Sequence, residues 1–207
     1  MAHEIYVYGD RTSVHIFKSL TCDVYVGITC STGFKHFISI PPRDAFHTII
    51  VCNDSHTGNY SYSQSSIQKC RHMAPMYNSI PEDEMNRLPR LLPLSIDTNW
   101  NLDNYTGVLL SALYTVKAAV SGCLYGKKLI LLDCSLDQQY NLILAACVLS
   151  MYSNNCSSVQ EFLLLFQRCW DFRLPSQELL DTAQLCSCKM AITCSTQKTA
   201  KQKCLLM

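Results

Sequence analysis

The residues with the clearest potential for chemistry lie between an apolar, strand-like segment and an apolar, helix-like one. Cys134 follows the run Lys128–Asp133 and precedes the run Asn141–Tyr152. Backbone N–H groups at the start of a helix bind anions and lower the pKa of a nearby thiol. Cys134 is therefore a candidate nucleophile. Asp97, after an earlier strand-like run, is a candidate general acid. The loop that would bind the anion consists of Ser135, Leu136, Asp137, Gln138, Gln139 and Tyr140.

The first half of the chain has the pattern of strands. Alternation of β-branched or aromatic residues with polar ones predicts five of them, at Ile5–Tyr8, Asp23–Ile28, Lys35–Ile40, His47–Cys52 and Leu91–Ile96. Residues 53–78 are polar and lack periodicity, which predicts a long loop or an irregular insertion. A short helix is expected from Pro81 to Leu88, with acidic residues in its first turn.

The second half has the pattern of alternating helix and strand. The spacing of apolar residues from Leu109 to Val120 predicts a helix that ends near Gly122, and Lys128–Asp133 is expected to be a central strand. Asn141–Tyr152 is apolar on all sides, which indicates a buried helix. Ser158-Val-Gln-Glu161 has the form of a capping box opening a helix through Trp170, and Pro175-Ser176 begins another that ends at about Cys186.

These elements predict an α/β fold, with a central twisted mixed or parallel sheet flanked by helices and a C-terminal helical cluster. The expected division is a domain over residues 1–186 and a flexible, basic, cysteine-containing tail over residues 187–207.

Composition narrows the function classes. In 207 residues, hydrophobic side chains make up 48% and charged ones 16%, which is typical of a globular domain. The net charge of +1 gives no strong signal for nucleic-acid binding. The N-terminus lacks the pattern of a signal peptide, and no long apolar window indicates a membrane span. The expected location is therefore cytoplasmic.

Cysteine usage is high, with 13 in the chain, and we expect these to be reduced thiols that mostly fill apolar space. Cys186, Cys188 and Cys194 do not have the spacing of a zinc site, so no metal is expected. No cofactor is expected either.

The stretch from Leu91 to about Gln184 resembles the catalytic half of the dual-specificity, cysteine-dependent phosphatases. The likeness rests on Leu-Leu-Pro-Leu-Ser-Ile-Asp97, the helix that follows, Gly126-Lys-Lys-Leu-Ile-Leu-Leu-Asp-Cys134, and the loop and buried helix beyond. Glu4-Ile-Tyr-Val-Tyr-Gly9-Asp10 is similar to the opening strand of that family. The resemblance implies that Cys134 corresponds to the nucleophile and Asp97 to the general acid.

The loop departs from the family signature HCxxGxxR. Asp133 stands in place of histidine, Asp137 in place of glycine and Tyr140 in place of arginine, while Asn141 replaces a serine or threonine. Loss of the guanidinium removes two charge-assisted hydrogen bonds to phosphate, and a carboxylate at Asp137 repels the anion. These changes predict a catalytically impaired protein, a pseudophosphatase that binds a protein partner or a phospho-ligand. Tyr140 and Asp137 are candidates for the partner surface.

Two alternatives remain open. In the first, the chain is an active tyrosine/serine/threonine phosphatase in which Arg168 or Arg173 replaces the missing arginine. In the second, it is a domain related to tRNA modification. Leu136-Asp137, the helix from Asn141 and Leu174-Pro175-Ser176-Gln-Glu-Leu179 are similar to parts of the phosphatase-like C-terminal domain of initiator-tRNA 2'-O-phosphoribosyl transferases.

The last residues printed, Cys204-Leu-Leu-Met207, have the form of a prenylation signature, with methionine favouring a farnesyl group. Lys198, Lys201 and Lys203 precede it and suit an anionic membrane surface. Because one lipid chain anchors weakly, the basic cluster or acylation at Cys186, Cys188 or Cys194 is expected to act as a second signal. The sequence therefore also predicts a peripheral membrane contact through the tail.

Overall fold

The structure is a computed structural model, and it describes residues 3–8, 12–18, 24–29, 48–54, 90–96, 101, 103–122, 127–133, 138–153 and 158–204. Over residues 3–8, 12–13, 48–54, 90–96 and 192–204, and at positions 122, 133 and 138, the description is of the backbone alone. The strand expected at Lys35–Ile40, the helix expected at Pro81–Leu88 and most of the loop expected over residues 53–78 lie outside these ranges.

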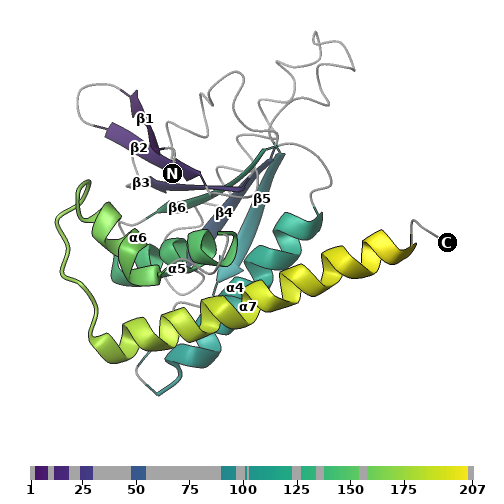
Figure 1. Cartoon of the computed structure of the whole chain (residues 1–207). Helices are drawn as coiled ribbons and strands as arrows, with labels where there is room; N and C mark the ends of the chain where they lie inside the picture. Colours follow the sequence, from purple (N-terminus) through teal and green to yellow (C-terminus); the bar gives the residue numbers. More distant parts are fainter. Residues whose placement is uncertain are drawn as a thin grey trace, which may run out of the picture.

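The described strands form one mixed sheet, shown edge-on in Figure 1. They are β1 (His3–Tyr8), β2 (Thr12–Lys18), β3 (Val24–Thr29), β4 (Thr48–Asp54), β5 (Arg90–Ile96) and β6 (Lys128–Asp133). Their order across the sheet is β1-β2-β3-β6-β4-β5. The first three strands are antiparallel, whereas β3, β6, β4 and β5 run parallel to one another. The α/β fold with a mixed sheet, predicted from the sequence, is confirmed.

Strand β2 was not among the predicted strands, and its burial explains why. The side chains of Val14, His15, Ile16 and Phe17 are all buried, so the strand lacks the alternation of buried and exposed residues that marks a half-exposed strand. His15 packs edge-on against Trp170 at a ring-centroid distance of 4.4 Å. That contact comes from a segment far along the chain, and a local pattern does not contain it.

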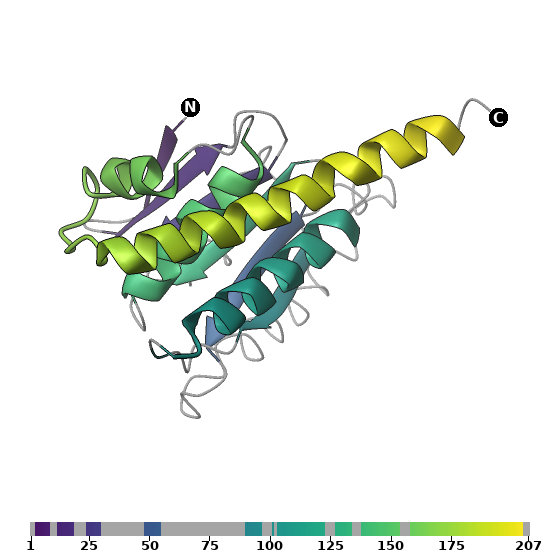
Figure 2. The ribbon, with the colours of Figure 1, turned by 60° about the horizontal axis from the view of Figure 1, so that its bottom comes forward.

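The described helices are α4 (Tyr105–Gly122), α5 (Gln138–Met151), α6 (Val159–Phe166) and α7 (Gln177–Cys204). All of them lie on the same face of the sheet (Figures 1 and 2). Helix α5 contacts β3 and β6 on one side and α6 and α7 on the other, so it is the centre of the helical layer. As the sequence predicted, it is buried all round: every side chain from Leu142 to Ser150 is inaccessible to solvent.

Helix α6 starts at the predicted place but is not capped in the predicted way. The Ser158 side chain makes no capping hydrogen bond. Instead, the side-chain Oε1 of Gln184 in α7 accepts from the backbone N–H of Val159 at 2.7 Å. The α-helix ends at Phe166 rather than Trp170, and the chain continues through a tighter turn in which Cys169 N donates to Phe166 O at 2.8 Å.

Helix α7 begins where Pro175-Ser176 predicted it, but the expected end near Cys186 is wrong. The helix continues to Cys204, and the side chains of Ser187 and Met190 are fully buried. The packed part of the chain therefore extends beyond position 186, and the boundary expected there falls inside a helix. Figure 2 shows the last turns of α7 extending past the other helices.

Hydrogen bonds between helices explain this longer packing. Ser187 Oγ donates to Cys147 O at 3.1 Å, and Cys147 Sγ donates to Ala183 O at 3.6 Å, which joins α7 to α5. Lys117 Nζ donates to Met190 O at 3.3 Å and joins α7 to α4. Among the described helices, none is long and apolar enough to cross a membrane.

Gly27 in β3 leaves little room for a side chain beside the leucines of β6. A Cβ atom there would lie 2.8 Å from Leu131 Cδ1 and 3.3 Å from Leu129 Cδ1. We expect Gly27→Ala to lower the free energy of unfolding by about 1–3 kcal/mol through overpacking. Part of this loss should be recovered by combining it with Leu131→Val, measured by urea denaturation.

The matched control is Gly107→Ala in α4, where the added methyl group meets nothing within 4 Å. Because alanine favours the helix, this change should stabilise the protein by roughly 0.5–1 kcal/mol. Equal effects of the two substitutions would contradict the close packing at Gly27.

Candidate functional site

The strand ends that precede the two candidate catalytic residues lie at the same edge of the sheet. Strands β4, β5 and β6 are parallel, and Cys52 of β4 is in register with both Leu132 and Leu94. Asp133 at the end of β6 is therefore nearly level with Ile96 at the end of β5. Since only β4 lies between them, the two strands are roughly 10 Å apart. The carboxyl edge of such a sheet is where α/β proteins bind ligands.

Cys134, Asp97 and the loop residues Ser135, Leu136 and Asp137 lie outside the described residues. Their assignment as a vestigial nucleophile, acid and phosphate loop stays a prediction. What the backbone establishes is the order of elements around them: β5, then α4, then β6, then α5.

The start of α5 is described, and it changes the expected role of Tyr140. The helix begins at Gln138, Gln139 is exposed, and Tyr140 is 0% exposed. The interpretation of Tyr140 as part of a partner surface is therefore wrong, because its side chain packs in the core. The position that holds arginine in the phosphatase signature here contributes an aromatic ring to the interior.

Tyr140 belongs to a buried group of phenols and thiols around Tyr105. Burial raises the pKa of the Tyr105 phenol well above its usual value of 10.0, and three neighbours raise it further: Cys147, Tyr140 and Cys186. Burial also raises the pKa of the Cys186 thiol, against a smaller lowering by Lys189. Phenols and thiols with raised pKa values remain neutral near pH 7, so this group serves packing.

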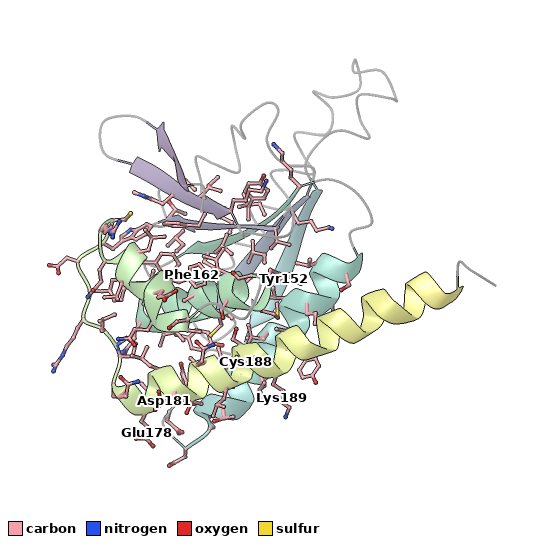
Figure 3. All side chains as sticks on the ribbon, in the orientation of Figure 1. Tyr152, Phe162, Glu178, Asp181, Cys188 and Lys189 are labelled. Carbon is pink, nitrogen blue, oxygen red and sulfur yellow. The ribbon has the colours of Figure 1, made fainter. Side chains whose placement is uncertain are left out.

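Of the two half-buried thiols among the described residues, Cys169 is a poor nucleophile candidate. Burial raises the pKa of Cys169, an effect that outweighs the neighbouring Arg168. Because the thiolate is the reactive form, this environment does not favour nucleophilic chemistry at Cys169. Cys188 lies on α7, where Figure 3 labels it, and its sulfur accepts a hydrogen bond from Gln184 Nε2 at 3.2 Å. Within the described ranges, no group of three or more acidic, histidine or cysteine side chains is placed to hold a metal ion.

A pocket of about 680 Å³ lies beside the first turn of α5. Gln139 forms one wall, and the connection between α6 and α7 together with the first turn of α7 forms the other (residues 172–176 and Leu179). Arg173, one of the two arginines named from the sequence as a possible substitute clamp, lines this pocket, whereas Arg168 does not. The sequence contains Gln139 and Arg173 as separate features, and only the packing of α7 against α5 brings their segments together.

A comparison with solved structures gives a likeness in fold. The crystal structure of Tk-PTP in the active form matches with a TM-score of 0.45 and 17% sequence identity, over 82% of this chain and 95% of that one. No protein-family model and no curated protein matches the chain. The site residues above therefore rest on the chain's own sequence and topology.

Replacing Tyr140 with arginine tests its burial. Tyr140→Arg alone should lower the free energy of unfolding by about 3–5 kcal/mol, because it places an uncompensated charge in the core. Tyr140→Phe, the control that keeps the ring, should cost no more than about 1–1.5 kcal/mol. Both values are measurable by chemical denaturation followed by circular dichroism. A Tyr140→Arg protein as stable as Tyr140→Phe would mean that this side chain faces the solvent.

Proposed function

We propose that this chain is a phosphatase-like domain that acts by binding a protein partner or a phospho-ligand at the carboxyl edge of its sheet, without efficient hydrolysis. The resemblance of its second half to cysteine-dependent phosphatases supports the fold assignment. The order of β5, α4, β6 and α5, with Asp97 and Cys134 directly after parallel strand ends, is compatible with it.

The single observation that carries the loss of activity is the burial of Tyr140. A phosphatase of this type needs a guanidinium that projects into the phosphate loop and makes two charge-assisted hydrogen bonds to the transferred group. Here that position supplies a phenol to the core, and a phenol carries no positive charge. At roughly 1.5–3 kcal/mol per missing hydrogen bond, the rate falls by about two to four powers of ten.

The alternative is an active phosphatase that uses Cys134, Asp97 and a guanidinium from another element. The position of Arg173 in the pocket beside Gln139 is the observation that favours it. The two proposals differ in a directly measurable quantity, the turnover that depends on Cys134.

Hydrolysis of p-nitrophenyl phosphate by the purified chain decides between them. We expect any residual turnover to be unchanged by Cys134→Ser, because the thiolate lacks the anion-binding partners that catalysis needs. Cys188→Ser is the matched control, since that thiol lies on α7. Turnover that is abolished by Cys134→Ser and retained in Cys188→Ser would overturn the proposed function and establish the alternative.

We also propose that the chain contacts membranes through a lipid at Cys204. In a chain that ends at Met207, Cys204-Leu-Leu-Met is the signature that prenyltransferases read. Cys204 is the final residue of α7, on the part of the helix that extends past the rest of the fold (Figure 2). Acylation of Cys186 as the second membrane signal is disfavoured by its burial. The lysines at positions 198, 201 and 203 are the better second signal.

Incorporation of a labelled farnesyl group in cells tests this proposal. Cys204→Ser should abolish the label, and Cys188→Ser should leave it unchanged. Label that persists in the Cys204→Ser chain would rule out lipidation at this position.

A further inference from the structure

The pocket beside α5 has the composition of a ligand site with one charge. Four of its lining side chains are apolar, those of Phe172, Leu174, Pro175 and Leu179. Two are neutral and polar, Gln139 and Ser176, and one is a cation, Arg173. Its volume of about 680 Å³ falls in the range of pockets that bind small organic groups or peptide side chains. Apolar walls with a few convergent polar groups are the usual features of such sites.

Arg173 is placed to meet a ligand. The residue is exposed, and within the described parts of the chain no hydrogen bond or ion pair engages its guanidinium. A guanidinium presents a planar fork of donors that matches the geometry of a carboxylate or a phosphate. Its charge is also permanent at any physiological pH.

Acidic residues near the pocket do not occupy it. Asp171, Glu178 and Asp181 are exposed and none of them lines the pocket. Glu178 and Asp181 lie on the first turns of α7, as Figure 3 shows, and Asp181 Oδ1 accepts a hydrogen bond from Gln177 Nε2 at 2.8 Å. Exposed charges of this kind are screened by salt, so they compete weakly for the Arg173 guanidinium.

The walls are held in place before any ligand binds. Gln167 Nε2 donates to Phe172 O at 3.0 Å, which fixes the start of the connection between α6 and α7. Leu180 N donates to Ser176 O at 3.1 Å, and Gln184 Oε1 joins α7 to the start of α6. A preformed site loses less conformational entropy on binding than a loop that must become ordered.

From this geometry we infer that the pocket is the docking site for a peptide segment of a protein partner, in which an anionic side chain pairs with Arg173 and a neighbouring apolar side chain packs on Phe172 and Leu179. The inference rests on the proposed binding function and gives it a location. Recognition of the anion then depends on the connection between α6 and α7, which lies beside Gln139 in the first turn of α5.

Three small probes separate the contributions of charge and ring: phenyl phosphate, benzoate and the neutral benzyl alcohol. In titrations of the full chain followed by nuclear magnetic resonance, we expect both anions to bind more tightly than benzyl alcohol. Arg173→Gln should weaken anion binding about tenfold or more, the loss that corresponds to a charge-assisted hydrogen bond, and leave benzyl alcohol unchanged. Arg173→Lys, which keeps the charge without the fork, should lie between the two.

Arg168→Gln is the matched control, because this exposed arginine lies five positions earlier and outside the pocket. It should bind all three probes with the affinity of the unchanged protein.

Equal anion binding by Arg173→Gln and Arg168→Gln would overturn the pocket assignment and leave the proposed non-hydrolytic role intact. Absence of any anion binding to the full chain would overturn the pocket assignment as well. Cys134-dependent hydrolysis would instead overturn the proposed function alone. The relative affinities of phenyl phosphate and benzoate identify the anion as phosphoryl or carboxylate.

Discussion

The burial of helix α5 is the constraint on which the rest of the fold depends. A helix that is apolar on every side has no stable place at a surface, so it must be enclosed by other elements. The parallel strands β3 and β6 cover one side of it, and α6 and α7 cover the other. This enclosure fixes where the chain leaves β6, where α5 starts and how far α7 must run to complete the cover.

The same constraint acts on the candidate site. Helix α5 begins at Gln138, and Tyr140 in its first turn is buried in the core as a neighbour of Tyr105. A side chain that is needed for packing is not available to hold an anion. The cation that lines the pocket beside this helix start is Arg173, on the connection between α6 and α7. The proposed binding without efficient hydrolysis is compatible with a cation supplied from outside α5, since binding tolerates a displaced charge and transition-state stabilisation does not.

Several polar groups in the helical layer form hydrogen bonds between helices. Gln184 of α7 accepts from the first turn of α6, Ser187 of α7 donates to a carbonyl of α5, and Lys117 of α4 donates to a carbonyl of α7. Each of these bonds joins segments that are distant in sequence, and a buried polar group left without such a partner would destabilise the fold. They explain why α7 stays helical and packed beyond Cys186.

The sequence by itself determined the elements whose signals are local. The apolar spacing of α4, the apolar run of α5, the strand at β6 and the start of α7 at Pro175-Ser176 could all be predicted, because periodicity and helix-start residues act over a few positions. Tertiary structure alone decided four features: the buried strand β2, the capping of α6 by Gln184, the orientation of Tyr140 and the meeting of Gln139 with Arg173 in one pocket. Each depends on which distant surface covers a residue, and the free energy of burial and hydrogen bonding is set by that neighbour rather than by the residues beside it in the chain.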